Sequence, residues 1–266
     1  MTTTLTRRAA AREEIARAMA SRAHAFVVHY ACEGFEKPDR RVTAIAARNL
    51  GSGVTQSFEV STMLRRAGVD PVKATPQELD QAEREMFKAF YAFVSSHVAA
   101  TYWLHWNMRD STFGFAALEN RYRRLGGRPV KIPELFRVDL AARMIDLYGD
   151  NYAAQDNRLR SLADRNRLVT KHLVDGAEQA AALERGDFEV VDRSLHNRID
   201  LLYAVATKAN EDTLKTQASL ADRIGAAGGV VQWLKSNPVI LACTIAAPVL
   251  TVLTGGWKLW TLFHGG

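Results

Sequence analysis

Three acidic residues and one histidine occupy positions at which a sheet and a helix could bring them together. Glu33 follows a short apolar run, Asp110 follows a second one, and Asp200 lies in a long helical stretch. Carboxylates at strand ends that face a carboxylate on a helix supply the oxygen ligands that Mg²⁺ prefers. His196 lies one helical turn before Asp200 and could position or deprotonate a water molecule. The pattern predicts a site for Mg²⁺ or Mn²⁺ in which two ions activate water for attack on a phosphodiester.

Each of these residues also has an ordinary structural interpretation. Asp110 could cap the helix that begins after it, and Glu33 could form an ion pair within its loop. His196 and Asp200 could lie on a solvated helix face, with Arg198 among their partners. The residues themselves leave both interpretations open.

Residues around the second apolar run are candidates for contacts with a substrate. Asn107 could orient a ligand, whereas His105, within an aromatic strand, could equally be a buried core histidine. The densest basic segment, residues 121–131, could contact a phosphate backbone, although such segments are commonly solvated helix ends. The arginines expected to bind phosphates are Arg121, Arg124 and Arg128.

The elements that must position these residues include four predicted strands. The apolar run 25–31 predicts a core strand, and the alternating runs 41–50 and 54–60 around a Gly-Ser-Gly turn predict a β-hairpin. The short run 101–106 predicts a further strand. A hairpin joined through one crossover helix to another strand implies a mixed sheet.

The helices expected around this sheet are marked by caps and by apolar periodicity. Thr75 can cap the crossover helix, and Glu78 stands three residues later, as in a capping box. Further helices are expected over residues 6–23, in a stretch that ends at 124, and over 133–148, 157–168 and 188–224. We therefore expect an α/β fold, with an all-helical domain carrying a small ribbon as the alternative.

This order of elements and acids resembles the RNase H-like DEDD exonucleases, the DnaQ-like group, over roughly residues 24–210. The resemblance implies that Glu33 is the second acid of the first motif. Asn107 and Asp110 would belong to the middle motif, and His196 with Asp200 to the last one. It also implies an RNase H-like sheet and metal-dependent 3′–5′ exonuclease activity. Ala31 stands where the family has a metal-bridging Asp, which favours a chain that has lost catalysis.

The C-terminal part has the character of a membrane anchor. Residues 238–257 carry no charge, and a bilayer core needs about 20 such residues. Trp233 precedes this run and Trp257 ends it, at the depth where interfacial aromatic residues belong. Pro248 lies inside the run and keeps a buried core helix open as the alternative. We expect a domain over 1–226 and a transmembrane anchor over 227–266.

Composition narrows the class of protein and its partners. The chain has 266 residues, is 47% hydrophobic and 24% charged, and contains two cysteines, which argues against disorder and against a disulfide-stapled scaffold. Its net charge of +6 favours polyanionic partners, either nucleic acid or an anionic membrane. The N-terminus lacks the apolar core of a signal peptide, so the large domain is expected on the cytoplasmic side of a bacterial inner membrane.

Two functions agree with these features. The first is a membrane-anchored, divergent nuclease domain that acts on or binds nucleic acid or a nucleotide through a metal site. The second is an inactive sensor or scaffold, or a membrane effector, that works through its anchor and through oligomerisation. A role in bacterial antiviral defence would suit either function, by analogy alone.

Overall fold

The computed structural model describes residues 4–34, 36–37, 39–97, 99–219 and 222. Within them the chain forms an α/β fold with a five-stranded mixed sheet and eight α-helices. The strands are β1 (Ala25–Cys32), β2 (Val42–Asn49), β3 (Thr55–Glu59), β4 (Tyr102–His105) and β5 (Arg137–Asp139). Their order across the sheet is β3-β2-β1-β4-β5. Only β2 runs against the other four, so β1, β3, β4 and β5 all end at one edge of the sheet, which we call the carboxyl edge.

β1 is the central strand, and all eight of its residues are buried. Its side chains alternate between two hydrophobic cores, with Val27 and Ala31 on one face and Val28 and Tyr30 on the other. A strand covered on both faces reads as a continuous apolar run, which is why its sequence lacks polar alternation.

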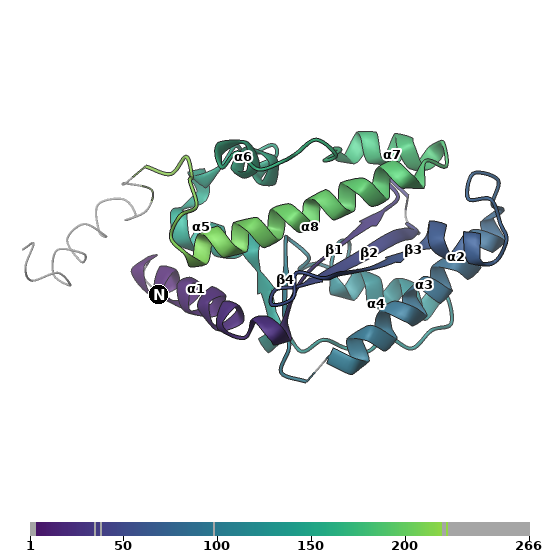
Figure 1. Cartoon of the computed structure of the whole chain (residues 1–266), viewed down its shortest axis with the longest axis horizontal. Coiled ribbons are helices and arrows are strands. Elements are labelled where there is room, and N and C mark those ends of the chain that lie inside the picture. The colour runs from purple at the N-terminus through teal and green to yellow at the C-terminus, as the bar shows by residue number, and fades with distance from the viewer. Residues whose placement is uncertain (1–3, 35, 38, 98, 220–221, 223–266) are drawn as a thin grey trace, which may run out of the picture.

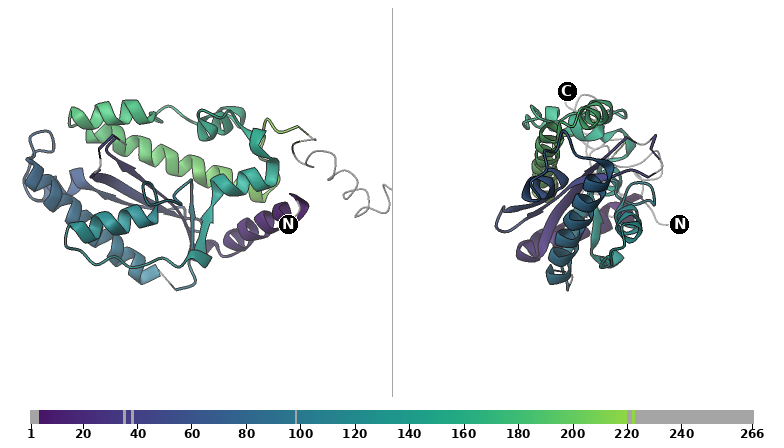
Figure 2. Two further views of the ribbon diagram at one scale, coloured as in Figure 1. Left: turned by 180° about the vertical axis from the view of Figure 1, so that it is seen from behind. Right: turned by 90° about the vertical axis from the view of Figure 1, so that its right-hand side faces the viewer.

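Helices cover both faces of the sheet, as the views of Figure 2 show. The α-helices are α1 (Thr4–Ala20), α2 (Val60–Arg66), α3 (Pro76–His97), α4 (Phe115–Arg124), α5 (Leu140–Tyr148), α6 (Arg158–Arg165), α7 (Gly176–Glu184) and α8 (Phe188–Asn210). Short 3₁₀ turns lie at Arg22–His24, Glu134–Phe136 and Asp150–Tyr152. One core packs α2, α3 and α4 against the sheet, and the other packs α1, α5, α6 and α8 (Figure 1).

Most of the expected elements are confirmed, with bounds that shift by a few residues. The capping box before α3 forms as expected, since the Glu78 amide lies 3.3 Å from Thr75 Oγ1 and the Thr75 amide 2.7 Å from Glu78 Oε2. The prediction of a helix over 133–148 is wrong for the first half of that range, which forms a 3₁₀ turn and β5 instead. The helix expected over 188–224 ends at Asn210, and Asp212 follows it with a φ of 58°.

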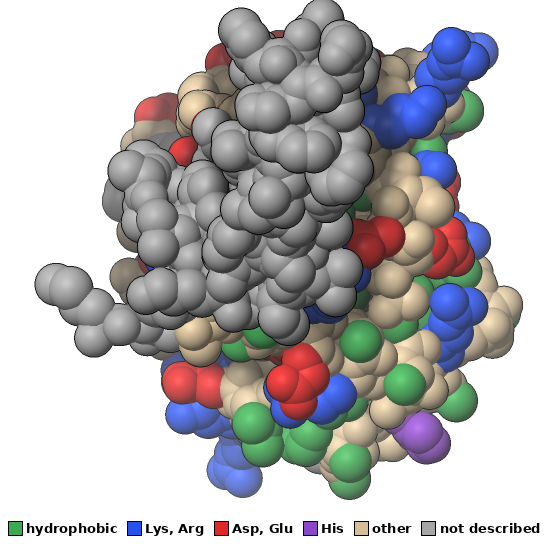
Figure 3. Space-filling model, turned by 90° about the vertical axis from the view of Figure 1, so that its left-hand side faces the viewer, with side chains coloured by type: hydrophobic (Ala, Val, Ile, Leu, Met, Phe, Trp, Pro, Cys, Tyr) green, Lys and Arg blue, Asp and Glu red, His purple; other side chains and the backbone are tan. Residues whose placement is uncertain are grey.

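On the part of the face in Figure 3 that grey atoms do not cover, charges of both signs are interspersed. None of the helices within the described ranges is long and apolar enough to cross a bilayer. The anchor expected over 227–266, with Trp233, Pro248 and Trp257, lies outside the described residues.

Candidate functional site

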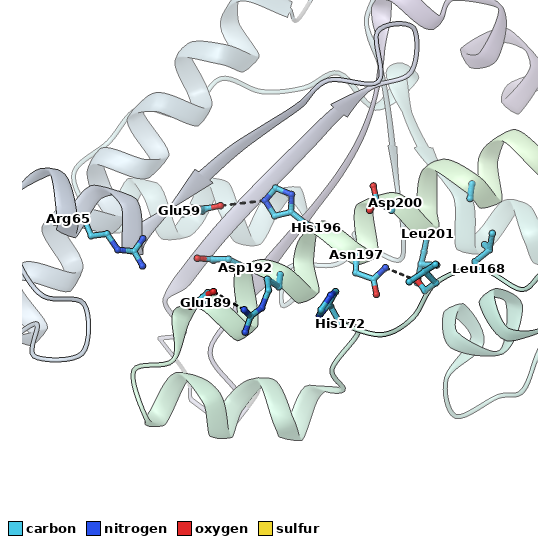
Figure 4. Close-up of a pocket in the computed structure, with 13 residues that line it drawn as sticks. Glu59, Arg65, Leu168, His172, Glu189, Asp192, His196, Asn197, Asp200 and Leu201 are labelled. Atoms are coloured by element: carbon cyan, nitrogen blue, oxygen red, sulfur yellow. Dashed lines mark hydrogen bonds and ion pairs between the residues drawn. The ribbon is translucent and has the colours of Figure 1, made fainter.

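Most of the sequence-predicted residues line one of three cavities, two of which adjoin, whereas His105, Asp110 and Arg128 line none of them. The first is an α8–β3 cavity of about 800 Å³, between α8, the end of β3 and the loop before α7 (Figure 4). Its wall includes the predicted catalytic residue His196 and the predicted metal ligand Asp200. Glu59 and Asp192 also line it, and Figure 4 shows both carboxylates beside the His196 ring.

His196 is held by polar groups of the edge strand β3. Its Nε2 lies 2.9 Å from Ser57 Oγ and 3.5 Å from Glu59 Oε1. The interaction with Glu59 raises the pKa of His196 and lowers the pKa of Glu59, because each stabilises the charged form of the other. The ring of His196 is therefore one half of an ion pair below the raised pKa.

Asp192 has the most perturbed carboxyl group in this cavity. Burial raises its pKa to about 7, and the negative charge of Glu59 acts in the same direction. Its Oδ2 accepts a hydrogen bond from Ser61 Oγ at 2.9 Å, while its buried Oδ1 has no partner within the described residues. The carboxyl is thus partly protonated near neutral pH.

Most other charges of the α8–β3 cavity have a partner within the protein. Asp200 binds the guanidinium of Arg48 on β2, and Glu189 binds Arg193 one turn further along α8 at 2.7 Å. Arg65 lines the cavity without an ion pair among the described residues, and Asp192 Oδ1 is likewise unpartnered there. The paired charges make this cavity chiefly an ion-pair cluster.

The second cavity opens at the carboxyl edge of β1 and β4 and has a volume of about 760 Å³. We call it the carboxyl-edge cavity. Its wall includes the predicted residues Glu33 and Asn107, the aromatic side chains Trp106 and Phe113, and the first residues of α6 and α7. In open sheets with parallel strands, ligands bind outside the carboxyl ends of the strands, where neighbouring connections diverge.

Arg198 of α8 lines this cavity and has no carboxylate partner among the described residues. Its Nη2 donates only a long hydrogen bond, 3.4 Å, to the carbonyl oxygen of Val174. Burial lowers the pKa of the guanidinium, yet an arginine remains protonated at neutral pH. The carboxyl-edge cavity thus contains a cation that the protein itself does not neutralise.

His29 of β1 is the second unsatisfied group of this cavity. It is 3% exposed, and its Nδ1 lies 2.8 Å from the amide nitrogen of Tyr30. Its Nε2 has no hydrogen-bond partner within the residues that the structure describes. Burial and the charge of Arg198 lower its pKa well below the usual range, so the ring is neutral at pH 7. When Nδ1 accepts from the Tyr30 amide, Nε2 carries the hydrogen and can donate.

His105 belongs to the core, as its alternative interpretation allowed. It is 3% exposed, and burial lowers its pKa to about 4. The Met108 amide donates to its Nδ1 at 3.2 Å. The backbone amide of Asn107 donates to Asp139 Oδ1 at 3.0 Å, and its side-chain oxygen accepts from Arg109.

The acids predicted to bind metal are not brought together. Asp200 binds Arg48, which pairs with Val27, six residues before Glu33. At about 3.3 Å per residue this separates the two strand positions by roughly 20 Å. Glu33 is instead bound to Arg41, with its Oε1 3.3 Å from Nη1.

Asp110 forms a local turn. Its Oδ1 accepts from the amides of Thr112 at 2.8 Å and Phe113 at 2.6 Å. No group of three His, Cys, Asp or Glu side chains in the described part of the chain could hold a metal ion. These residues therefore do not fit a two-metal centre.

The third cavity, of about 640 Å³, contains four arginines and no acidic residue in its wall. We call it the arginine cavity, and its charged residues are Arg40, Arg121, Arg123 and Arg124. It shares Tyr30 and Cys32 with the carboxyl-edge cavity, so the two adjoin at the end of β1.

The predicted phosphate-binding arginines differ in their availability. Arg121 is 6% exposed and binds the buried Glu83, with Nη2 2.5 Å from Oε2, so it stabilises the core. Arg124 is about half exposed and pairs with Asp39, which is equally exposed. Arg128 is exposed in the loop after α4 and lies outside the wall of this cavity.

Sequence reasoning missed the two groups that the carboxyl-edge cavity leaves unsatisfied. His29 has the signal of a polar residue inside a fully apolar strand, a pattern that deserves an explanation wherever it occurs. Arg198 has no such signal, because an arginine on an amphipathic helix is ordinary until the face it occupies is known.

No protein-family model matches the sequence, and neither the comparison with curated proteins nor that with solved structures gives a match. The cavities and their residues are therefore the evidence on function.

Proposed function

We propose that this chain is a nucleic-acid-binding domain of RNase H-like architecture that works without a two-metal centre. It holds a single strand of nucleic acid along the carboxyl edge of its sheet. In the full chain it acts as the sensing part of an effector that residues 227–266 attach to the membrane. This proposal corresponds to the alternative of an inactive sensor. It adds single-stranded nucleic acid as the ligand and the carboxyl edge of the sheet as the surface that binds it.

The sheet supports the architectural part of the proposal. A mixed sheet of order β3-β2-β1-β4-β5 in which β2 alone is reversed agrees with an RNase H-like arrangement. The carboxyl edge of β1 and β4 is also where the resemblance would place the ligand. The separation of Glu33 from Asp200 and the presence of Ala31 both argue against hydrolysis at that edge.

The observation that carries the proposal is the adjoining pair of cavities at this edge. The arginine cavity supplies positive charge with no acidic residue in its wall, which suits a phosphate backbone. The carboxyl-edge cavity adds Trp106, a half-buried aromatic side chain on which a base can stack. Charge beside an aromatic platform is typical of proteins that bind single strands.

Exposed arginines of the arginine cavity can exchange their protein partners for phosphates at little cost. Arg123 pairs with Glu119 one turn earlier in α4, with about half of its side chain exposed, and Arg124 pairs with Asp39. The Arg124–Asp39 pair is exposed on both sides, and such pairs contribute about 0–1 kcal/mol each, while Glu119, 13% exposed, keeps Arg137 3.8 Å away when Arg123 leaves it. A phosphate oxygen can therefore replace the carboxylate.

The test is fluorescence anisotropy with labelled single-stranded oligonucleotides of about 10 nucleotides, within the usual range of site sizes. EDTA is present in the main titration, and a parallel titration replaces it with Mg²⁺. We expect saturable binding that weakens with salt. The double variant Arg123→Glu/Arg124→Glu should weaken binding at least tenfold and lower the slope of log K against log salt by about two.

The matched control is Arg17→Glu/Arg193→Glu. Arg17 and Arg193 are also exposed and also pair with a glutamate one helical turn away, but they lie outside both edge cavities. Equal loss of binding in this control would show that only net charge matters and would overturn the proposal. Binding that requires Mg²⁺, followed by strand cleavage, would favour the nuclease instead.

A further inference from the structure

We propose that the carboxyl-edge cavity recognises a terminal phosphate monoester, with Arg198 and His29 as its ligands to the phosphate. The inference rests on the proposed function and names the chemical group that occupies one end of the bound strand. The phosphate could stand at a 5′ or a 3′ end, since both present the same dianionic group.

Arg198 is placed as a phosphate ligand would be. It lies one helical turn after Ser194, whose Oγ accepts from the Val174 amide at 3.1 Å, and its own Nη2 reaches the Val174 carbonyl. These contacts hold the guanidinium between α8 and the loop before α7. Because no carboxylate of the described residues pairs with it, its charge is available to an anion in the cavity.

His29 supplies a neutral donor to the same cavity in the tautomer whose Nδ1 accepts from the Tyr30 amide, rather than the one that donates to the Tyr30 carbonyl oxygen 3.1 Å away. Its ring is 3% exposed, lines the cavity, and leaves Nε2 without a partner among the described residues. Nε2 is not fully shielded from solvent, so it opens onto the cavity, where a ligand oxygen can be its partner. Arg198 lines the same cavity.

The first turn of α7 adds backbone donors at the same place. Gly176 begins the helix, and a side chain added there would meet no atom within 4 Å, so its backbone borders open space. Asp175 caps the amide of Glu178 at 2.8 Å, which leaves the amides of Gly176 and Ala177 directed out of the helix end. Helix N-termini stabilise phosphate groups through these amides.

Acidic residues of the wall limit the cavity to one phosphate. Glu33, Glu36, Asp156 and Asp175 line it together with Arg158 and Arg198, although Glu33 is bound by Arg41 and Asp175 caps α7. The acids disfavour a second phosphate beyond the one that Arg198 binds, whereas the arginine cavity on the other side of Tyr30 attracts the backbone. A strand can therefore enter from the arginine cavity and end beside Arg198, which is the geometry of end recognition.

The test compares one labelled oligonucleotide in three forms: 5′-phosphorylated, 3′-phosphorylated, and with hydroxyls at both ends. Binding to the full chain is measured in EDTA. We expect one phosphorylated form to bind at least tenfold more tightly than the hydroxyl form. Arg198→Met should abolish that difference, while Arg193→Met, on the exposed side of α8, should preserve it.

Two further measurements keep the result interpretable. Arg198→Met should melt no lower than the wild type, because it removes an unpaired buried charge; a structural role would lower Tm instead. In the wild type, excess inorganic phosphate should compete away the advantage of the phosphorylated form. Equal affinity for all three forms would overturn this inference and leave the proposed function standing, whereas no binding of any form would overturn both.

Discussion

At the scale of single residues, two arginines show how differently one residue type is used. Arg121 is enclosed by Glu83, Asp80 and Asp39, whereas Arg198 reaches only a carbonyl oxygen. The sequence predicts a phosphate contact for Arg121 and a structural ion pair for Arg198. The difference arises because partners come from other elements: Glu83 lies on α3, and no carboxylate of the described chain forms an ion pair with Arg198.

Asp192 gives a prediction for the dependence of stability on pH. Its pKa is about 7 in the folded state, against about 3.9 for an ordinary aspartate. Between these two values the folded state binds more protons than the unfolded state, so rising pH lowers stability through this group. Asp192→Asn removes the charge and should raise the free energy of unfolding by about 2 kcal/mol at pH 8, with little effect at pH 4, where Asp192 is protonated in the folded state and about half protonated in the unfolded state.

Thermal unfolding at the two pH values checks this prediction, with a rise in Tm of roughly 5 °C expected for the variant at pH 8 only. Ser61→Ala serves as the companion variant, because it removes the hydrogen bond to Asp192 and keeps the charge. An equal change in Tm at both pH values would show that the buried charge is not the cause.

At the scale of elements, the buried pair of Glu83 and Arg121 joins α3, α4 and the sheet. Glu83 accepts from the Val42 amide of β2 at 2.7 Å and from Arg121 of α4. Its side chain is fully buried, and burial raises its pKa even with Arg121 beside it. Arg121→Met removes the closer cation of this carboxylate, leaving Arg41 Nε 3.8 Å from Oε2, and should cost about 3 kcal/mol of stability.

Urea unfolding measures this loss against Arg124→Met, which breaks an exposed pair and should cost less than about 1 kcal/mol. The double variant Glu83→Gln/Arg121→Met should recover part of the stability, since the unpaired charge is gone. Similar losses for Arg121→Met and Arg124→Met would contradict the role assigned to the pair.

The elements predictable from the sequence are those whose signals are local. The capping box of α3 and the apolar stripe of α8 lie within the residues that form them, and both are confirmed. β5 is three residues long and becomes a strand only by pairing with β4, for example Leu104 with Val138. The pairing that makes β5 a strand depends on β4, a distant segment of the chain. The local sequence shows only helical periodicity, so a helix is predicted over the residues of β5 as well.

At the scale of the whole molecule, the site could not be predicted because it depends on how α8 is rotated. Val191, Leu195 and Ile199 face the core, which directs His196 and Asp200 towards β3 and Arg198 towards the carboxyl edge. His196 and Asp200 lie one helical turn apart on one face of α8, as expected, but that face is directed towards β3 and not towards Glu33 and Asp110. Rotation of a helix about its axis is set by packing, and no local pattern reports it.

The distribution of charge over the molecule explains why the net charge alone does not identify the partner. The visible part of the face in Figure 3 mixes both signs, whereas the wall of the arginine cavity holds one sign only. In the proposed function it is this local arrangement of arginines near an aromatic side chain, and not the net charge, that favours nucleic acid over a merely anionic surface.

The proposed function places a single strand of nucleic acid across the two edge cavities. It is tested most directly by photo-crosslinking the full chain to an end-phosphorylated oligonucleotide that carries one photoreactive base, in EDTA, followed by mass spectrometry of the adducts. With the base at the phosphorylated end, we expect adducts at Trp106 or its neighbours in the carboxyl-edge cavity. Moved several nucleotides inward, it should mark α4 around Asn120 and Arg123. Adducts confined to the α8–β3 cavity, or spread over all faces, would contradict the account.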